Sequence, residues 1–132
     1  MKKENNKSWK NPNFFEALKH SIDGIFLVIK QERNIKIQLC FALFAVIIGI
    51  ITKISSIEWL ILVITICLVL YAELMNTALE NTVDLITEEF NEKAKLAKDI
   101  SSGAVLICAI MSVIVGIIIF LPKLLVMINI LK

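Results

Sequence analysis

Residues 59–89 read WLILVITICLVLYAELMNTALENTVDLITEE, and this stretch decides the fold. Its first fourteen residues, 59–72, carry no charge and are largely apolar, and a polar pattern begins directly after them at Glu73. As a helix, fourteen residues rise about 21 Å, whereas the hydrocarbon core of a bilayer is about 30 Å thick. A helix that crosses the membrane must therefore continue past Glu73. This carboxylate is expected near the inner edge of the membrane, inside protein.

The polar side chains that follow residue 72 share one face of the continued helix, because they recur at helical spacing. The set is Glu73, Asn76, Thr77, Glu80, Asn81, Asp84, Thr87 and Glu88. Glu73 and Glu80 stand too close to the apolar run to be ordinary surface residues, since a charge at the centre of a membrane helix costs about 2.5–3.5 kcal/mol. Carboxylates and an asparagine on one face can hold a hard cation such as Mg²⁺, whereas Thr87 and Glu88 suit a solvated face.

Two further apolar runs complete a layout of three membrane spans. One covers residues 37–52, and the other extends from Ile100 to Leu121, directly before Pro122. Hydrophobic residues make up 58% of the chain, more than the roughly 45–50% of a soluble domain. We expect an all-α membrane protein with a single domain over 13–132, whose spans lie at about 35–53, at 56–76 with a cytoplasmic extension to about 89, and at 99–121.

The N-terminal third predicts a basic tail and an amphipathic helix. Residues 1–12 are rich in lysine and asparagine, and we expect them to be disordered. Between about 13 and 30, apolar residues recur every three or four positions, at Phe14, Leu18, Ile22, Ile25 and Ile29. This stripe predicts a helix that either lies in the membrane interface or docks on the other helices.

The positive charges predict the orientation in the membrane. Eight of the fourteen Lys and Arg residues precede the first apolar run: Lys2, Lys3, Lys7, Lys10, Lys19, Lys30, Arg33 and Lys36. Lys93, Lys95 and Lys98 lie between the second and third runs. Because basic residues favour the cytoplasmic side, the N-terminus and this connection are expected to be cytoplasmic.

Small residues predict where helices approach closely. Ala104, Cys108, Ser112 and Gly116 recur at steps of four in the third span, and Ala45 and Gly49 are four residues apart in the first. Small side chains allow backbones of membrane helices to pack closely. We therefore expect a helix contact along this stripe, without chemistry of its own.

Residues 73–107, ELMNTALENTVDLITEEFNEKAKLAKDISSGAVLI, closely resemble the small bacterial diacylglycerol kinase and undecaprenol kinase family. The resemblance starts near Ser21 and includes the DGI and QERNIKI segments. It implies a kinase that moves the γ-phosphate of ATP, with Mg²⁺, onto the hydroxyl of a membrane lipid alcohol. It also implies a homotrimer in the bacterial cytoplasmic membrane, with composite active sites between neighbouring chains.

By position, the resemblance implies that Glu73 is the general base that takes the proton of the lipid hydroxyl. Asn76 would help to hold the reacting phosphate and the metal. Glu32 and Glu80 would bind the metal. These residues include the carboxylates whose membrane position already marked them as costly.

The start of the third span carries the expected nucleotide contacts. Lys98 can neutralise phosphate charge, and Asp99 can cap the helix or contact a nucleotide. The resemblance assigns Lys98 to the nucleotide phosphate and Asp99 to the nucleotide. Two positions depart from some enterobacterial members: Asn13 stands where they have an arginine, and Gln38 where they have an acidic residue.

The lipid and even the class of function have alternatives. The QERNIK and SSIEWLILV segments look more like Gram-positive members, many of which phosphorylate undecaprenol, and diacylglycerol is the alternative substrate. The residues alone, with no phosphate-binding glycine loop and with His20 as the single histidine, indicate a buried acidic membrane site without naming a kinase. A non-catalytic scaffold or an ion carrier would use the same helices. No nucleic-acid partner is expected.

Overall fold

The computed structural model describes residues 13–87 and 89–130, so the expected tail over 1–12 lies outside the described residues. Its helices, in chain order, are α1 (Phe14–Gln31), α2 (Arg33–Ile51), α3 (Ser56–Ile86) and α4 (Glu92–Ile130). The described part of the chain contains no strand. Each of α2, α3 and α4 is long and apolar enough to cross a membrane. The prediction of an all-α membrane protein with three spans is confirmed.

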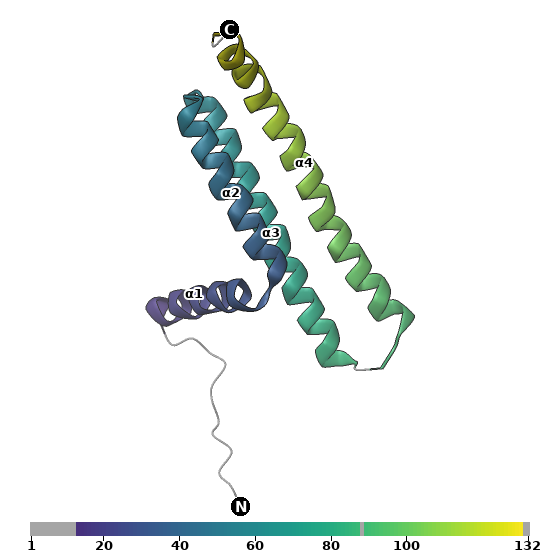
Figure 1. Ribbon diagram of the computed structural model, residues 1–132. Helices are drawn as coiled ribbons and strands as arrows, with labels where there is room; N and C mark the ends of the chain where they lie inside the picture. Colours follow the sequence, from purple (N-terminus) through teal and green to yellow (C-terminus); the bar gives the residue numbers. More distant parts are fainter. Residues whose placement is uncertain (1–12, 88, 131–132) are drawn as a thin grey trace, which may run out of the picture.

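Helix α1 runs crosswise to the three long helices and projects from the start of α2 to the side away from α4 (Figure 1). It begins where Asn13 caps it, because the Asn13 side chain accepts a hydrogen bond of 2.9 Å from the backbone N–H of Glu16. It ends at Glu32, whose extended backbone separates α1 from α2. The apolar stripe of α1 stays uncovered, with Leu18, Ile22 and Ile25 all exposed. An uncovered apolar stripe favours a helix that lies in the membrane interface over one docked on its neighbours.

Helices α2 and α3 form a hairpin that is closed by a tight contact at Gly49. A Cβ atom added to Gly49 would lie 3.0 Å from the Trp59 ring and 3.1 Å from Ile54. Ile54, Leu62 and Ile119 form the small core beside this contact. The hairpin is therefore fixed at the end farther from Glu73.

Helix α4 packs chiefly along α3 and touches α2 only slightly. It starts at Glu92, seven residues before the expected start of the span, and continues through Pro122 to Ile130. The apolar run does end before Pro122, but the helix does not. Proline removes one N–H and crowds one earlier carbonyl, and a membrane helix tolerates it where neighbouring groups satisfy the freed backbone.

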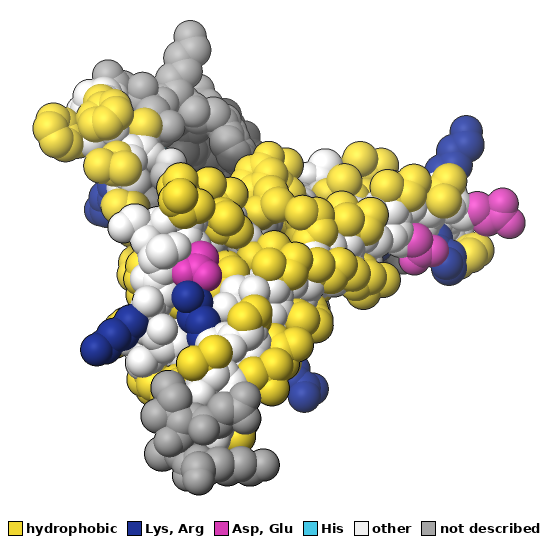
Figure 2. Space-filling view, turned by 90° about the horizontal axis from the view of Figure 1, so that it is seen from above, with side chains coloured by type: hydrophobic (Ala, Val, Ile, Leu, Met, Phe, Trp, Pro, Cys, Tyr) yellow, Lys and Arg dark blue, Asp and Glu magenta, His cyan; other side chains and the backbone are white. Residues whose placement is uncertain are grey.

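Gly116, one member of the small-residue stripe of α4, makes no close contact within the single chain, so the helix contact expected along this stripe stays a prediction. A Cβ atom at Gly116 would meet no atom within 4 Å. The reason is that α4 leaves α2 along this stretch and leaves open space between them. Figure 2 shows how apolar side chains cover most of the visible face, as expected for surfaces that meet lipid or further chains.

Candidate active site

The site begins at Glu73, which is 2% exposed although it is a carboxylate in a membrane helix. Helix α3 directs it toward α2, where Gln38 Nε2 donates a hydrogen bond of 2.9 Å to Glu73 Oε2. This burial confirms the expectation, from the length of the apolar run, that Glu73 lies inside protein. A buried carboxylate is tolerated only when polar partners compensate its lost hydration, and Gln38 is such a partner.

One helical turn further along α3, Asn76 joins α3 to α4. Asn76 is 8% exposed, and its Nδ2 donates to Glu80 Oε1 at 2.9 Å. Its Oδ1 accepts hydrogen bonds from Ser101 Oγ at 2.6 Å and from Ser102 Oγ at 3.4 Å. The side chain of Asn76 is thus held at both ends, which fixes its orientation toward Glu80.

Ser101 and Ser102 are site residues that sequence reasoning did not identify. They form a pair of hydroxyls at the start of an otherwise apolar run, one helical turn after Lys98. Ser101 Oγ also contacts the carbonyl oxygen of Lys98 at 3.0 Å. The signal was present in the sequence, but only the packing of α4 on α3 shows that Asn76 is their partner.

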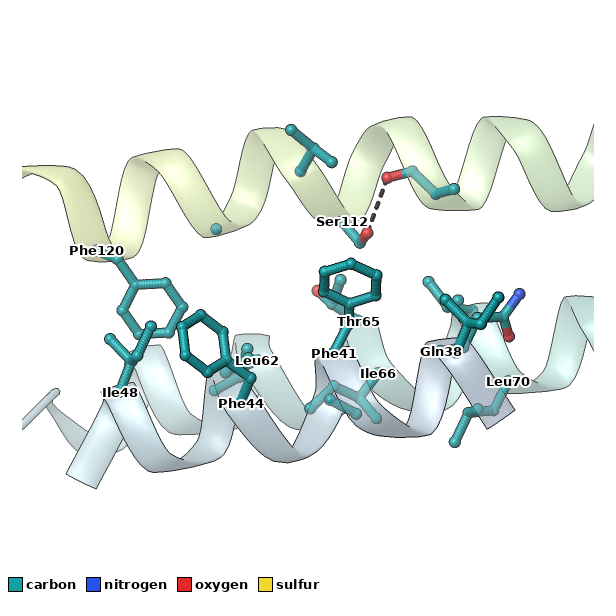
Figure 3. A pocket seen from close by; sticks show the side chains of 17 residues that line it. Gln38, Phe41, Phe44, Ile48, Leu62, Thr65, Ile66, Leu70, Ser112 and Phe120 are labelled. Atoms are coloured by element: carbon teal, nitrogen blue, oxygen red, sulfur yellow. Dashed lines mark hydrogen bonds between the residues drawn. The ribbon is translucent and has the colours of Figure 1, made fainter. Parts of the chain in front are cut away.

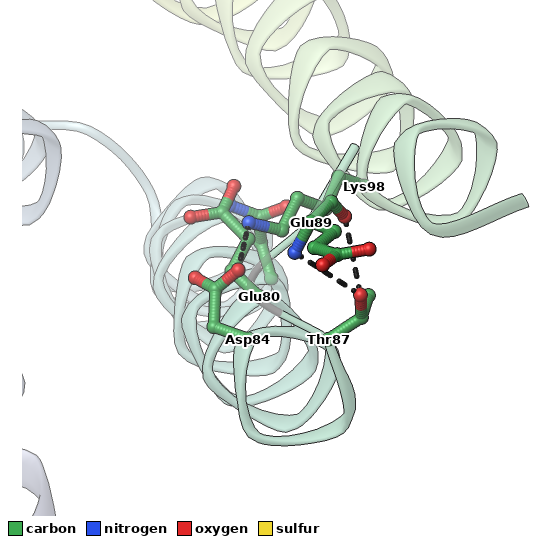
Figure 4. A network of polar contacts seen from close by, with 6 residues as sticks. Glu80, Asp84, Thr87, Glu89 and Lys98 are labelled. Carbon is green, nitrogen blue, oxygen red and sulfur yellow. Dashed lines mark hydrogen bonds and ion pairs between the residues drawn. The ribbon is translucent and has the colours of Figure 1, made fainter. Parts of the chain in front are cut away.

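Lys98 and Asp99 lie closer than Ser101 and Ser102 to the connection between α3 and α4. Lys98 forms an ion pair with Asp84 across the two helices (Figure 4), and Asp99 pairs with Lys95 on its own helix. These four side chains line a polar pocket of about 580 Å³ together with the connection itself. Asp84 is thus the partner of Lys98 in the isolated chain.

Glu32, the remaining expected site residue, is half-buried at the break between α1 and α2. Its side chain makes no cap hydrogen bond to α2. Among the described residues, no three His, Cys, Asp or Glu side chains gather closely enough to hold a metal by themselves. The structure therefore brings Glu73, Asn76 and Glu80 together along α3 and does not join Glu32 to them.

Comparison with known proteins identifies the family. The family model described as prokaryotic diacylglycerol kinase matches residues 19–120. The chain belongs to the prokaryotic diacylglycerol kinase family. An undecaprenol kinase from Bacillus subtilis is 42% identical over 84% of this chain and 90% of its own length. A diacylglycerol kinase from Synechocystis is 36% identical over 86% of this chain and 66% of its own length, and one from Escherichia coli is 39% identical over 54% and 59%.

As a member of the prokaryotic diacylglycerol kinase family, the chain is a lipid kinase, and ATP is its phosphate donor. Membership of a kinase family argues against the two other hypotheses, a non-catalytic scaffold and an ion carrier. Phosphoryl transfer needs little covalent chemistry from a protein beyond positioned charge and alignment. Glu73 is buried on α3, and further along α3 the pocket near Lys98 is lined by charged side chains of both signs.

Proposed function

We propose that this chain phosphorylates undecaprenol at the cytoplasmic face of the bacterial cytoplasmic membrane. The observation that carries the proposal is the 42% identity to an undecaprenol kinase over 90% of that relative's length. The buried carboxylate of Glu73 supports it, since a lipid hydroxyl enters from the membrane. Diacylglycerol is the second candidate, because the relatives from Synechocystis and Escherichia coli are named diacylglycerol kinases.

In the proposed reaction, Glu73 takes the proton of the lipid hydroxyl while the hydroxyl oxygen forms a bond to the γ-phosphorus of ATP. The bond from that phosphorus to the bridging oxygen breaks, and ADP leaves. Asn76, held by Glu80 and Ser101, is proposed to donate to the transferring phosphate from its fixed position. The general base and the phosphate contact are then one helical turn apart on α3.

The nucleotide is proposed to bind in the polar pocket near the connection between α3 and α4. Lys98 there pairs with Asp84, and both side chains are partly accessible. A phosphate group is a stronger partner for a lysine than an exposed carboxylate, so bound ATP would take Lys98 from Asp84. Asp99, on the same pocket wall, would contact the nucleotide itself.

The carboxylate of Glu80 is a suitable ligand for Mg²⁺, which prefers oxygen ligands. Mg²⁺ is commonly held by one or two carboxylates together with substrate phosphates, so it does not need a cluster of three protein ligands. Glu80 is half-buried and presents carboxylate oxygens beside Asn76. We assign Glu80 and Glu32 as its ligands. When bound, Mg²⁺ would neutralise charge on the phosphate oxygens.

The active enzyme is proposed to be a homotrimer with composite sites and with its N-terminus in the cytoplasm. In the described part of the single chain, Glu32 belongs to no group of three His, Cys, Asp or Glu side chains that could hold a metal. Large apolar side chains of α3, among them Leu60, Ile64 and Tyr71, are exposed. A neighbouring copy that covers α3 would supply both the missing contacts and the missing ligands. The basic N-terminal residues support the orientation.

The substrate test offers both alcohols to the purified protein in mixed micelles with Mg·ATP. We expect kcat/KM for undecaprenol to exceed that for dioleoylglycerol at equal mole fraction in the micelle. A preference for dioleoylglycerol would make the chain a diacylglycerol kinase. Phosphorylation of neither alcohol by assembled protein would contradict both assignments.

A further inference from the structure

Charge distinguishes two of the hollows in this molecule. A cleft of about 500 Å³ between α2, α3 and α4 is lined by apolar side chains and a few neutral polar ones (Figure 3). The pocket of about 580 Å³ beside the connection between α3 and α4 is lined by lysines and carboxylates, namely Lys95, Lys98, Asp84, Glu89 and Asp99. The pocket proposed for the anionic nucleotide therefore has one more carboxylate than lysines among its described lining residues.

Both lysines of this pocket are paired with carboxylates. Lys98 forms an ion pair with Asp84 across α3 and α4 (Figure 4), and Lys95 forms one with Asp99 on its own helix. The side chain of Lys98 is 34% exposed, against 61% for Lys95. A phosphate that enters the pocket must therefore compete with Asp84 for the less exposed of the two lysines.

The pair of Asp84 and Lys98 is not needed to join the two helices. Asn76 on α3 already accepts hydrogen bonds from Ser101 and Ser102 on α4, and α3 and α4 pack along most of their lengths. The side chain of Asp84 is 62% exposed, and an ion pair this accessible to water contributes little to stability. Its main effect is therefore expected on what binds in the pocket.

We propose that Asp84 governs release of the nucleotide: its carboxylate competes with the phosphates for Lys98 and so keeps ADP from being held tightly after transfer. The inference rests on the proposed nucleotide site. Where a phosphate displaces Asp84, the ion pair must be broken first. Where Lys98 donates to both groups, the carboxylate and the phosphate lie close together and repel each other. In both arrangements the charge of Asp84 weakens nucleotide binding.

The test measures binding of Mg·ADP to the purified protein in detergent by calorimetry. Asp84→Asn keeps the shape of the side chain and removes its charge, so we expect a Kd about threefold to tenfold lower than that of wild type. Asp84→Glu keeps the charge and should stay within about twofold of wild type. Because the competition is between charges, the difference between wild type and Asp84→Asn should shrink below about twofold in about 1 M NaCl.

The matched control is Glu92→Gln, which also removes one carboxylate near the connection between α3 and α4. Glu92 is exposed at the start of α4 and is not among the residues that line the pocket. Its substitution should leave the Kd for Mg·ADP within about 1.5-fold of wild type, because salt screens exposed charges that lack direct contact. In the phosphorylation assay, the Ki of ADP against ATP should fall in Asp84→Asn by the same factor as the Kd, with the KM for the lipid within about twofold of wild type.

Two results would overturn the role of Asp84. One is binding of Mg·ADP that is unchanged or weaker in Asp84→Asn, since weaker binding would mean that Asp84 positions Lys98 for the phosphates. The other is an equal gain of affinity in Glu92→Gln, since the effect would then come from net charge alone. If Asp84→Asn does not assemble, Asp84→Ser removes the same charge and is judged by the same limits. Failure of the nucleotide site itself gives a different result, because Lys98→Ala would then bind Mg·ADP as tightly as wild type.

Discussion

At the scale of single residues, Glu73 and Asn76 carry the argument because both are polar and both are buried in a membrane helix. Each has partners from a second helix: Gln38 on α2 for Glu73, and Ser101 on α4 for Asn76. Such partners offset the cost of removing polar groups from water. Polar residues that need this much support in a membrane usually serve function rather than packing.

Glu80→Ala should abolish lipid phosphorylation that depends on Mg·ATP, with kcat reduced by at least about a hundredfold. The change removes a proposed metal ligand and also releases Asn76 Nδ2 from its acceptor. Transfer of labelled γ-phosphate to the lipid measures the effect, and the size of the detergent complex controls for assembly. Full activity of Glu80→Ala would show that the metal is held elsewhere.

Ser101→Ala should lower kcat by about tenfold, because it removes the hydrogen bond of 2.6 Å that orients Asn76. The matched control is Ser21→Ala on α1, whose hydroxyl bonds only the carbonyl oxygen of Ala17 in its own helix. That control should retain wild-type activity. Equal activity of the two variants would mean that Ser101 does not orient Asn76 for the reaction.

At the scale of helices, the contact between α2 and α3 is fixed by the absence of a side chain at Gly49. The Trp59 ring occupies the space that a Cβ atom would take. By contrast, Gly116 on α4 faces the open cleft. The two glycines look alike in the sequence and differ only in what packs against them.

Gly49→Leu should lower the stability of the assembled protein by about 1–3 kcal/mol, because the added side chain overpacks the Trp59 contact. Gly116→Ala is the control. It should leave stability close to wild type, because a Cβ atom at Gly116 meets no other atom of the chain within 4 Å. Thermal unfolding in detergent compares the two. Unchanged stability of Gly49→Leu would contradict the close approach at this glycine.

At the scale of the whole molecule, the single chain leaves most of its apolar surface uncovered. Among the described residues, the buried large apolar side chains are Ile35, Ile54, Leu62 and Ile119. In the same part of the chain, no three His, Cys, Asp or Glu side chains lie close enough to hold a metal together. Both features fit a chain that is completed by lipid and by further copies of itself.

Mixing two inactive variants tests the composite site. Glu80→Ala and Glu32→Ala each lack one proposed metal ligand, and a site shared between two chains would take Glu80 from one chain and Glu32 from its neighbour. With random mixing of the two variants, half of the chains carry Glu80 and half carry Glu32, so one site in four has both ligands and up to about a quarter of wild-type activity should return. Coexpression followed by the phosphorylation assay measures it. Activity that stays at the level of the separate variants would place both residues in the same chain's site.

Much of the fold could be predicted from the sequence because membrane helices follow from apolar length. The three spans and the burial of Glu73 rest on local patterns. The extension of α4 through Pro122 could not be predicted from local patterns, because proline ends a helix in some settings and only bends it in others.

The site was less predictable, because its contacts join distant residues. Helical spacing alone predicted that Glu73, Asn76 and Glu80 share one face of a helix. The bonds from Gln38 to Glu73 and from Ser101 to Asn76 depend on how α2 and α4 pack on α3. The pairing of Lys98 with Asp84 depends on the same packing and has no signature in the sequence.

The most direct test of the central claim compares wild type with Glu73→Gln in transfer of labelled γ-phosphate from Mg·ATP to undecaprenol. The substitution keeps the size of the side chain and removes its ability to take a proton. We expect labelled lipid from wild type and a rate lower by at least about a thousandfold from Glu73→Gln, with the same assembly in detergent. A Glu73→Gln protein that labels the lipid within about threefold of the wild-type rate would contradict the account.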